Sequence, residues 1–413
     1  MSESDKPRTV ITGLGVIAPN GIGKEEFWEA LEAGRSGIKP ITIFDSRLFK
    51  THLAGEVTDF DAEKFLGVKG LRNLDRSTKF LCSAAKLALE DAGLQITENN
   101  TEDIGVVTAT TLSVIWNISE FGREAEQEGA RFVNPAMFPG TTINAPSSQV
   151  SIRFNIKGFN TTISTSYTAS LDALKYAIDF IKLGRAKVVL VCGVESLFFQ
   201  TFVGFSRIEF LAGIKGKEIS CPFDKRRNGI ILAEGAGILV VEEEEYARKR
   251  NARIYARIPA VESFFDAYRS GKYHPYADGL KRAMTKVLKN AELTKEGIDY
   301  ISAAANSVQE QDRLETYAIK EVFKDDAKGI PVSSIKSMIG EAVSASGVLQ
   351  IAAAIGAITK GFIPPTINYE ESDPECGLDY VPNKSREQEV KNVLINNFGP
   401  GGNNASAILC KYD

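Results

Sequence analysis

The sequence predicts an α/β fold in which mixed β-sheets are covered by helices on both faces. Short β-branched runs alternate with amphipathic helical segments along the 413 residues, which is typical of such sheets. The order of elements also repeats, because the helix, polar loop and strand at 77–109 are followed by the same order at 278–302. We therefore expect an internal duplication with two halves, 1–250 and 251–413.

The chain opens with a predicted strand and a glycine turn in RTVITGLGVIAPNG. Gly13, Gly15 and Ala18 match the G-x-G-x-x-A dinucleotide fingerprint. That fingerprint requires a helix directly after the turn, whereas here the loop continues and the helix begins only near Lys24. We therefore do not expect a dinucleotide site. The next helix is predicted at 77–92, with Ser77 as its N-cap.

Residues 161–184 form the centre of the predicted fold. A β-branched run at 161–165 predicts a strand, and Gly184 ends the helix that follows it. Tyr167 lies where the strand gives way to the helix, and a similar helix is predicted at 341–361. Backbone N–H groups at a helix start favour negative charge, which suits a thiolate nucleophile, but this chain has a tyrosine there.

Composition excludes several classes of function. With 43% hydrophobic and 25% charged residues and a net charge of −4, the chain is ordinary for a globular protein and predicts no nucleic-acid partner. The polar N-terminus indicates no secretory signal, and the apolar run at 349–358 is too short to span a membrane, so we expect a cytoplasmic protein. Five cysteines without CxxC spacing predict neither disulfides nor a metal site, and we expect no cofactor.

Five motifs together resemble the β-ketoacyl-ACP synthases of fatty-acid and type II polyketide synthesis. The resemblance covers nearly the whole chain, with the motifs in the family's order: VITGLGVIAPNG, SCPFDKRRNGIILAEGAG, VSSIKSMIGEAVSASG, PPTINYE and NNFGPGGNNA. It implies the thiolase fold, in which two duplicated ketosynthase-like halves form five αβαβα layers with mixed β-sheets. It also implies dimerisation along the strand that leads into the central helix.

Three positions depart from the family in a way that removes its chemistry. The resemblance places a nucleophilic cysteine at the position of Tyr167 and two catalytic histidines at those of Ala304 and Glu341. Three residues that support the family's site are retained: Lys336, Asp312 and Glu315.

Claisen condensation needs a thiolate carrier and hydrogen-bond donors to a developing anion. A phenol with a usual pKa of about 10 is a poor acyl carrier. Alanine donates nothing, and glutamate repels an anion. We therefore expect the chain to be inactive as a condensing enzyme on its own.

An intact scaffold without its chemistry resembles the chain length factor, or ketosynthase β, of type II polyketide synthases. Such a subunit pairs with an active ketosynthase and shapes the shared tunnel while malonyl units from an acyl carrier protein, which bears a phosphopantetheine-linked chain, are condensed. The usual residue at the nucleophile position is glutamine, so Tyr167 leaves aromatic and polyene pathways both open. Two alternatives remain: a stand-alone decarboxylase or acyltransferase of the same fold, and a binding module without a ketosynthase partner.

In the resembling subunits, a helix after the strand GVVTAT ends the tunnel. We expect four residues to share one face of that helix here: Leu112, Ile115, Trp116 and Ser119. Trp116 then either floors the tunnel or is an aromatic of the core or an interface.

Two further groups carry predictions from the resemblance. The gating phenylalanine of the family is replaced by Pro400, which stiffens the glycine-rich loop. Three basic residues either contact an acidic carrier protein or form a solvated surface: Lys69, Arg72 and Arg76.

Overall fold

The strands form two five-stranded halves of one 11-stranded sheet in the computed structural model, which describes residues 7–412. The first half has the order β1-β8-β7-β5-β6 and the second has the order β9-β15-β14-β10-β11. Their bounds are β1 Thr9–Ala18, β5 Ile104–Ala109, β6 Asn160–Ile163, β7 Val188–Glu195, β8 Gly235–Glu243, β9 Ala256–Phe265, β10 Tyr300–Ser302, β11 Val332–Ser333, β14 Asn392–Phe398 and β15 Asn403–Lys411.

The two halves repeat the same strand directions, which confirms the predicted duplication. In the first half, β5 is parallel to β6 and β7, whereas β8 is antiparallel to β7 and β1. In the second, β10 is parallel to β11 and β14, whereas β15 is antiparallel to β14 and β9. A short antiparallel pairing of β1 with β9 joins the halves through Val10↔Arg257 and Ile11↔Ala256.

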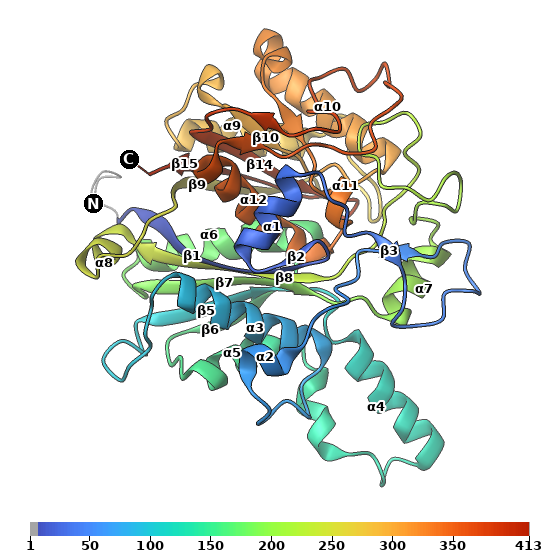
Figure 1. Ribbon diagram of the computed structural model, residues 1–413, viewed down its shortest axis with the longest axis vertical. Helices are drawn as coiled ribbons and strands as arrows, with labels where there is room; N and C mark the ends of the chain where they lie inside the picture. Colours follow the sequence, from blue (N-terminus) through green and yellow to red (C-terminus); the bar gives the residue numbers. More distant parts are fainter. Residues whose placement is uncertain (1–6, 413) are drawn as a thin grey trace.

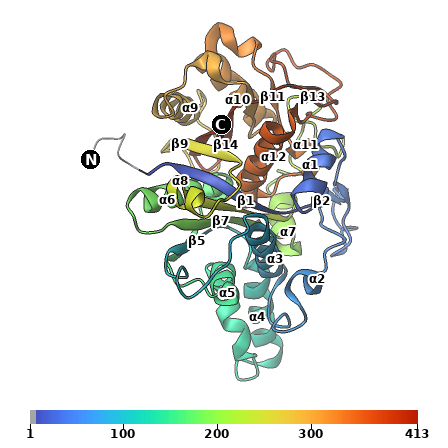
Figure 2. The same ribbon diagram turned by 60° about the vertical axis from the view of Figure 1, so that its left-hand side comes forward.

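Helices cover both faces of each half and produce the predicted five layers (Figures 1 and 2). The two central helices, α6 (Ala169–Lys182) and α12 (Ser346–Lys360), pack against each other between the halves. The outer layers contain α3 (Arg76–Asp91) with α5 (Ala145–Phe154) on one side, and α9 (Asp278–Asn290) with α10 (Gln309–Phe323) on the other.

The remaining helices and short strands lie around these layers. The helices are α1 Lys24–Glu32, α2 Ala62–Leu66, α4 Ile115–Glu128, α7 Phe199–Arg207, α8 Glu244–Lys249 and α11 Lys336–Ile339; the short strands are β2 Gly21–Ile22, β3 Lys39–Pro40, β4 Leu53–Ala54, β12 Phe362–Ile363 and β13 Arg386–Glu387. The 3-10 helices are η2 Pro135–Thr141, η3 Ser166–Thr168, η4 Lys295–Gly297, η5 Lys324–Lys328 and η6 Val343–Ala345.

The most apolar helix is a core element. The segment Val343–Lys360 is long and apolar enough to cross a membrane by composition, but 89% of it is buried inside the fold. Every residue of α12 from Ser346 to Ile358 is buried. A helix that is apolar on all sides is buried in a large domain or in a membrane, and here two layers of strands cover it.

The structure gives the two glycines of the fingerprint a packing role and corrects the predicted N-cap of α3. Gly13 and Gly15 lie inside β1, where a Cβ on either residue would collide with the carbonyl oxygen of Ala88 or Ala84 in α3. These glycines therefore let α3 approach the sheet, and the dinucleotide fingerprint is accidental. The N-cap of α3 is Asp75, whose carboxylate accepts the Thr78 N–H at 2.7 Å, so the prediction of Ser77 was wrong.

The segment formed by α4 and η2 projects from the layered body (Figure 1). Asn117 is the single buried residue of α4, and η2 has none. This segment therefore contributes little to the core of its own chain.

Candidate functional site

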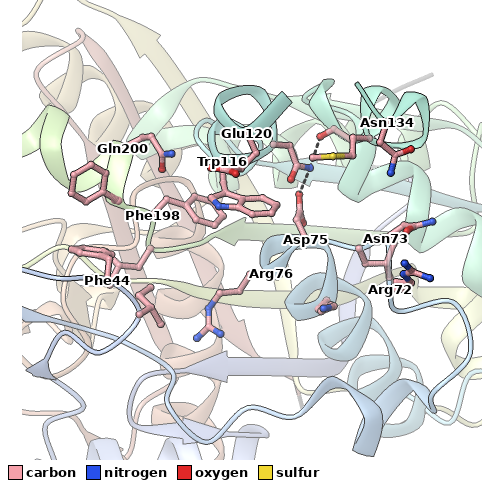
Figure 3. A pocket seen from close by; sticks show the side chains of 18 of the residues that line it. Phe44, Arg72, Asn73, Asp75, Arg76, Trp116, Glu120, Asn134, Phe198 and Gln200 are labelled. Atoms are coloured by element: carbon pink, nitrogen blue, oxygen red, sulfur yellow. Dashed lines mark hydrogen bonds between the residues drawn. The ribbon is translucent and has the colours of Figure 1, made fainter. Parts of the chain in front are cut away.

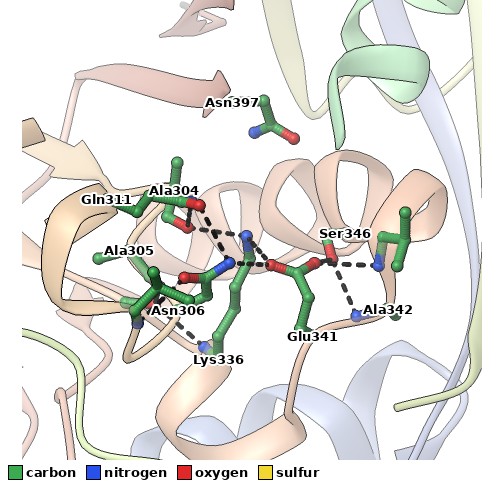
Figure 4. Close-up of polar contacts among 12 residues, drawn as sticks. Ala304, Ala305, Asn306, Gln311, Lys336, Glu341, Ala342, Ser346 and Asn397 are labelled. Carbon is green, nitrogen blue, oxygen red and sulfur yellow. Dashed lines mark hydrogen bonds and ion pairs between the residues drawn. The ribbon is translucent and has the colours of Figure 1, made fainter. Parts of the chain in front are cut away.

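The substituted positions meet where the two central helices begin. Tyr167 lies in η3, before α6, and Glu341 lies just before η6 and α12. Ala304 follows β10, and Lys336 begins α11, so four segments distant in the sequence converge here. Figure 4 shows three of these residues, Ala304, Lys336 and Glu341, in one connected polar network.

Lys336 and Glu341 form a buried ion pair at the centre of this network. The Lys336 Nζ lies 2.8 Å from the Glu341 Oε2, and the two side chains are only 3% and 1% exposed. The same ammonium group donates a hydrogen bond to the Ala304 carbonyl oxygen at 2.8 Å. The Glu341 carboxylate thus neutralises the lysine. Neither charge is free to act on a ligand.

Further hydrogen bonds hold the Glu341 carboxylate in place. Its Oε1 accepts the Ser346 hydroxyl at 2.6 Å and the Val343 N–H at 2.9 Å, and its Oε2 accepts the Asn306 side-chain amide at 2.9 Å. Val343 has φ +44°, which is rare for a β-branched residue. Because the carboxylate binds this strained residue, Glu341 stabilises the corner that precedes α12. The predicted helix at 341–361 consequently begins only at Ser346.

Tyr167 is buried in the position predicted for a nucleophile. It is 7% exposed, and no residue in the described range 7–412 hydrogen-bonds to its hydroxyl. Burial first, and then the negative charge of Glu341, raise the pKa of the phenol well above its usual value. The hydroxyl therefore stays protonated and is a poor nucleophile.

The glycine-rich turn between β14 and β15 closes over Tyr167. A Cβ on Gly399 would collide with the Tyr167 Cδ2, so the ring packs directly against the backbone of the turn. Pro400 is the next residue and is half-buried. The fixed φ of proline limits the movement of this turn. The tyrosine ring and the turn together fill the space at the start of α6.

Two retained carboxylates support the loop that carries Ala304. Glu315 accepts the backbone N–H groups of Ala304 and Ala305 at 2.9 and 2.8 Å, and Asp312 accepts that of Asn306 at 2.9 Å. Burial raises the pKa of Glu315 to about 7 and that of Asp312 to about 6. Both carboxylates accept hydrogen bonds from backbone N–H groups of this loop, which agrees with a supporting role.

A third buried carboxylate, which the sequence reasoning missed, holds the segment between β5 and α4. Glu195 ends β7 and accepts the backbone N–H groups of Thr111 at 2.7 Å and Leu112 at 3.0 Å. The Thr111 hydroxyl in turn lies 2.7 Å from that of Ser344, in the corner before α12. Burial raises the pKa of Glu195 from 4.5 to about 7. This residue links the substituted site to the start of α4.

The raised pKa of Glu195 predicts a pH dependence of stability. Between pH 4.5 and 7 the Glu195 carboxyl is protonated in the folded chain and ionised in the unfolded chain. The stabilisation that comes from this difference is complete below pH 4.5 and is lost as pH rises through 7. We expect Glu195→Gln to flatten the fall in the free energy of unfolding between pH 5 and 8, by at most about 1.4 kcal/mol per pH unit. Urea unfolding at several pH values measures this, and equal slopes in the two proteins would contradict it.

The four residues predicted for one helical face do not share one. The helix α4 begins at Ile115, so Leu112 lies before it, and its N–H is bound by the Glu195 carboxylate at 3.0 Å. The Ser119 hydroxyl donates a hydrogen bond to the Ile115 carbonyl oxygen at 2.8 Å. Trp116 is 39% exposed, so within this chain it is not a core aromatic.

Trp116 lines a cavity of about 740 Å³ between the starts of α3, α4 and α7 (Figure 3). Arg72 and Arg76 line the same cavity. Trp116, predicted for the tunnel, therefore lies beside two of the basic residues that were predicted for carrier-protein contact. Arg76 is not a free surface charge, since its guanidinium lies 2.5 Å from the fully buried carboxylate of Glu234. Lys69 is exposed and lies outside the cavity lining.

No group of three or more His, Cys, Asp or Glu side chains among residues 7–412 is placed to hold a metal ion. None of the five cysteines, which all lie within residues 7–412, forms a disulfide, and all five are buried. Burial raises the pKa of the Cys221 thiol to about 12 and that of Cys376 to about 11, so these thiols remain protonated near neutral pH. Neither of these two thiols is a reactive nucleophile near neutral pH.

Comparison with known proteins shows two matching domain families. The family described as "Beta-ketoacyl synthase, N-terminal domain" matches residues 6–247, and "Beta-ketoacyl synthase, C-terminal domain" matches residues 255–370. A curated relative, 3-oxoacyl-[acyl-carrier-protein] synthase 2 of Coxiella burnetii, is 38% identical over 410 residues, which cover 98% of this chain and 99% of the relative.

Two solved structures are similar over almost their whole length. One, described as "The ishigamide ketosynthase/chain length factor", is 34% identical to this chain and has a TM-score of 0.92. The match covers 99% of this chain and 100% of that structure's chain. A second, a type II PKS acyl-carrier protein in complex with its ketosynthase bound to the hexaketide, has a TM-score of 0.90 and 29% identity, with coverage of 99% and 100%.

Proposed function

Because the chain belongs to the β-ketoacyl synthase family, we propose that it is a non-catalytic chain length factor of a type II polyketide synthase. In this role it pairs with an active ketosynthase and shapes the tunnel for the growing chain, while the partner condenses malonyl units delivered by an acyl carrier protein. One of the two similar structures is that of a ketosynthase/chain length factor, and the other contains an acyl carrier protein, which agrees with this role.

The observation that carries the proposal is the buried Lys336–Glu341 ion pair. Condensation requires a nucleophile that carries the acyl chain and donors that stabilise the enolate. Tyr167 is buried and protonated, Ala304 offers only its backbone, and Glu341 is saturated by its own chain. The site is thus well packed and offers neither a reactive nucleophile nor a free hydrogen-bond donor for condensation. This combination favours a structural subunit over an enzyme that has lost its activity.

The edge of the sheet supports a partner of similar fold. Among the described strands, β6 pairs only with β5, so its other edge is open. Large apolar side chains are exposed on the neighbouring elements α4, η2 and α5: Ile118 at 52%, Phe138 at 59% and Ile152 at 71%. Open strand edges and exposed apolar groups are typical of surfaces that another chain covers.

The cavity beside Trp116 supports the proposed tunnel. It is bounded by α4, which packs against η2, and η2 packs against α5 beside β6, so we propose that a chain crossing from the partner enters the cavity here. Arg72 is exposed at the cavity and Lys69 is exposed nearby in sequence, and we propose both as contacts for an acidic carrier protein. Arg76 is excluded from this set because Glu234 already neutralises it.

Co-expression with an intact ketosynthase tests the proposal. We expect the two chains to co-purify at one-to-one stoichiometry and to condense malonyl units, because the partner supplies the thiol and imidazoles. The isolated chain should neither become acylated nor convert malonyl-ACP to acetyl-ACP, as mass spectrometry of the carrier protein would show. Turnover by the isolated chain at an enzyme-like rate would favour the stand-alone decarboxylase, and failure to co-purify would favour a separate binding module.

A further inference from the structure

The segment that projects from the layered body forms one wall of the cavity beside Trp116. We call residues 115–141, which contain α4 and η2, the arm. We infer that Asn117 is a positioning residue, which holds the arm against the body and thereby sets the length of chain that the cavity accepts. This inference rests on the proposed function, because it takes the cavity as the end of the tunnel.

The cavity lies between the arm and the body of the protein (Figure 3). Trp116, Glu120 and Asn134 line it from the arm. Phe44 and Arg72 are among the residues that line it from the body. The width of the cavity therefore depends on how closely the arm approaches the body.

Few contacts hold the arm in place. Asn117 is its single buried residue, at 9% exposure. Apart from the packing of α4 on α7 and of η2 on α5, the arm has one polar anchor. Within residues 7–412, the Asn117 amide makes the one hydrogen bond or ion pair that joins an arm side chain to a segment outside 112–144. A segment with so few buried contacts opens easily, so its position depends strongly on this residue.

The Asn117 amide links α3, α4 and η2. Its Nδ2 donates to the Asp75 carboxylate at 2.8 Å and to the Gly140 carbonyl oxygen at 2.7 Å, so both N–H bonds are used. Asp75 is itself fixed as the N-cap of α3, where it accepts the Thr78 N–H. A Cβ on Gly140 would lie 2.8 Å from the same Nδ2, so the missing side chain lets η2 approach this closely.

Loss of this link should widen the cavity. The bond to Asp75 is stronger than one between neutral groups, because its acceptor is a carboxylate. Without it, the arm is free to move away from the body, and a longer chain fits before its end meets the wall. The position of the arm is thus a determinant of chain length separate from the bulk of Trp116.

The first test measures the arm itself. Asn117→Asp keeps the volume of the side chain but turns both donors into acceptors, which face the Asp75 carboxylate and the Gly140 carbonyl oxygen. We expect backbone amides of residues 115–141 in the purified chain to exchange with deuterium at least about tenfold faster, the effect of losing a hydrogen bond to a charged group. Amides of α3 should keep their rates, because Asp75 still caps that helix.

The second test restores the link with the polarity reversed. Asn117→Asp combined with Asp75→Asn lets the amide introduced at position 75 donate to the carboxylate at position 117. Asparagine caps a helix as well as aspartate does, so α3 is retained. We expect the double variant to slow the exchange of the arm again, although its link to Gly140 is not restored.

The third test measures products of the co-purified pair with the partner ketosynthase. We expect Asn117→Asp to shift the products towards chains longer by one or more malonyl-derived units. The rate of malonyl consumption should stay unchanged, because the partner supplies the reacting groups. The double variant should move the products back towards the parental length. Mass spectrometry of the products distinguishes these outcomes.

Asn290→Asp is the matched control. The Asn290 amide also donates to a carboxylate, that of Glu262 at 2.6 Å, but it is exposed at the end of α9, far from α4 (Figure 1). This variant should leave the exchange of the arm and the product length unchanged.

An unchanged exchange rate of the arm in Asn117→Asp would overturn the inference, as would faster exchange with products of parental length. Loss of pairing in Asn117→Asp would support it if the double variant pairs again, and would overturn it if the double variant does not. Failure of the parent chains to pair would overturn the proposed function instead, and the exchange of the arm in the purified chain would still show whether Asn117 holds it.

Discussion

Replacing Lys336 with methionine is expected to lower the free energy of unfolding by about 3–5 kcal/mol. The substitution keeps the volume of the side chain but leaves the Glu341 carboxylate, 1% exposed, without a counter-charge. The desolvation cost of that charge is then no longer offset. Urea unfolding of the purified chain at pH 7.5 measures the loss. The expected effect is large because both side chains are almost fully buried, at 3% and 1% exposure.

The control for this prediction removes both charges at once. Lys336→Met combined with Glu341→Gln keeps an oxygen acceptor for Ser346 and Val343 while it eliminates the buried charge. We expect the double variant to be more stable than Lys336→Met alone, since neutral pairs avoid the cost of desolvation. If the single variant is as stable as the parent, the ion pair does not hold the site together. A double variant less stable than the single one would also contradict the account.

The second large effect is expected at the proposed partner surface. Phe138→Glu combined with Ile152→Glu should weaken binding of the ketosynthase partner at least 100-fold. Each interface anchor is worth about 2 kcal/mol or more, and 1.4 kcal/mol corresponds to a factor of ten. Both side chains are exposed, at 59% and 71%, so the fold of the chain itself should not change. Titration calorimetry gives the dissociation constant.

Tyr317→Glu is the matched control for the partner surface. Tyr317 is also an exposed aromatic, but it lies on α10, at the opposite end of the molecule from α4 (Figure 1). A new charge there should leave the dissociation constant unchanged. Equal weakening by this variant would show that added charge, and not the surface of α4, η2 and α5, governs pairing. An unchanged constant in the double variant would move the interface elsewhere.

Much of the architecture could be predicted because it depends on local patterns. The helical spacing of apolar residues before Gly184 correctly gave α6, and the repeated order of helix and strand gave the duplication that the sheet confirms. The family motifs gave the layers, as well as the positions of Tyr167, Ala304 and Glu341. Chemistry that is absent can be read from side-chain identity alone, because alanine and a buried phenol lack the required groups wherever they lie.

Long-range partners could not be predicted in the same way. Glu195 ends an apolar strand, and this position is a signal for a polar role, but nothing local indicates that it binds Thr111 and Leu112. The helix α4 begins only at Ile115, so Leu112 lies off the predicted helical face. Arg76 looked like a surface charge until the fold placed Glu234 beside it, 158 residues away in the sequence.

The sequence by itself determined the family and the layered α/β fold, because each follows from residue identity and short-range spacing. Only the tertiary structure decided that Glu341 neutralises Lys336, that the Tyr167 ring packs against the backbone of Gly399, and that Trp116, Arg72 and Arg76 line one cavity. These facts depend on which distant segments meet in a low-dielectric interior. In that interior, burial and the presence of a hydrogen-bond or ion-pair partner set the free energy of each polar group. No local sequence pattern indicates either of these.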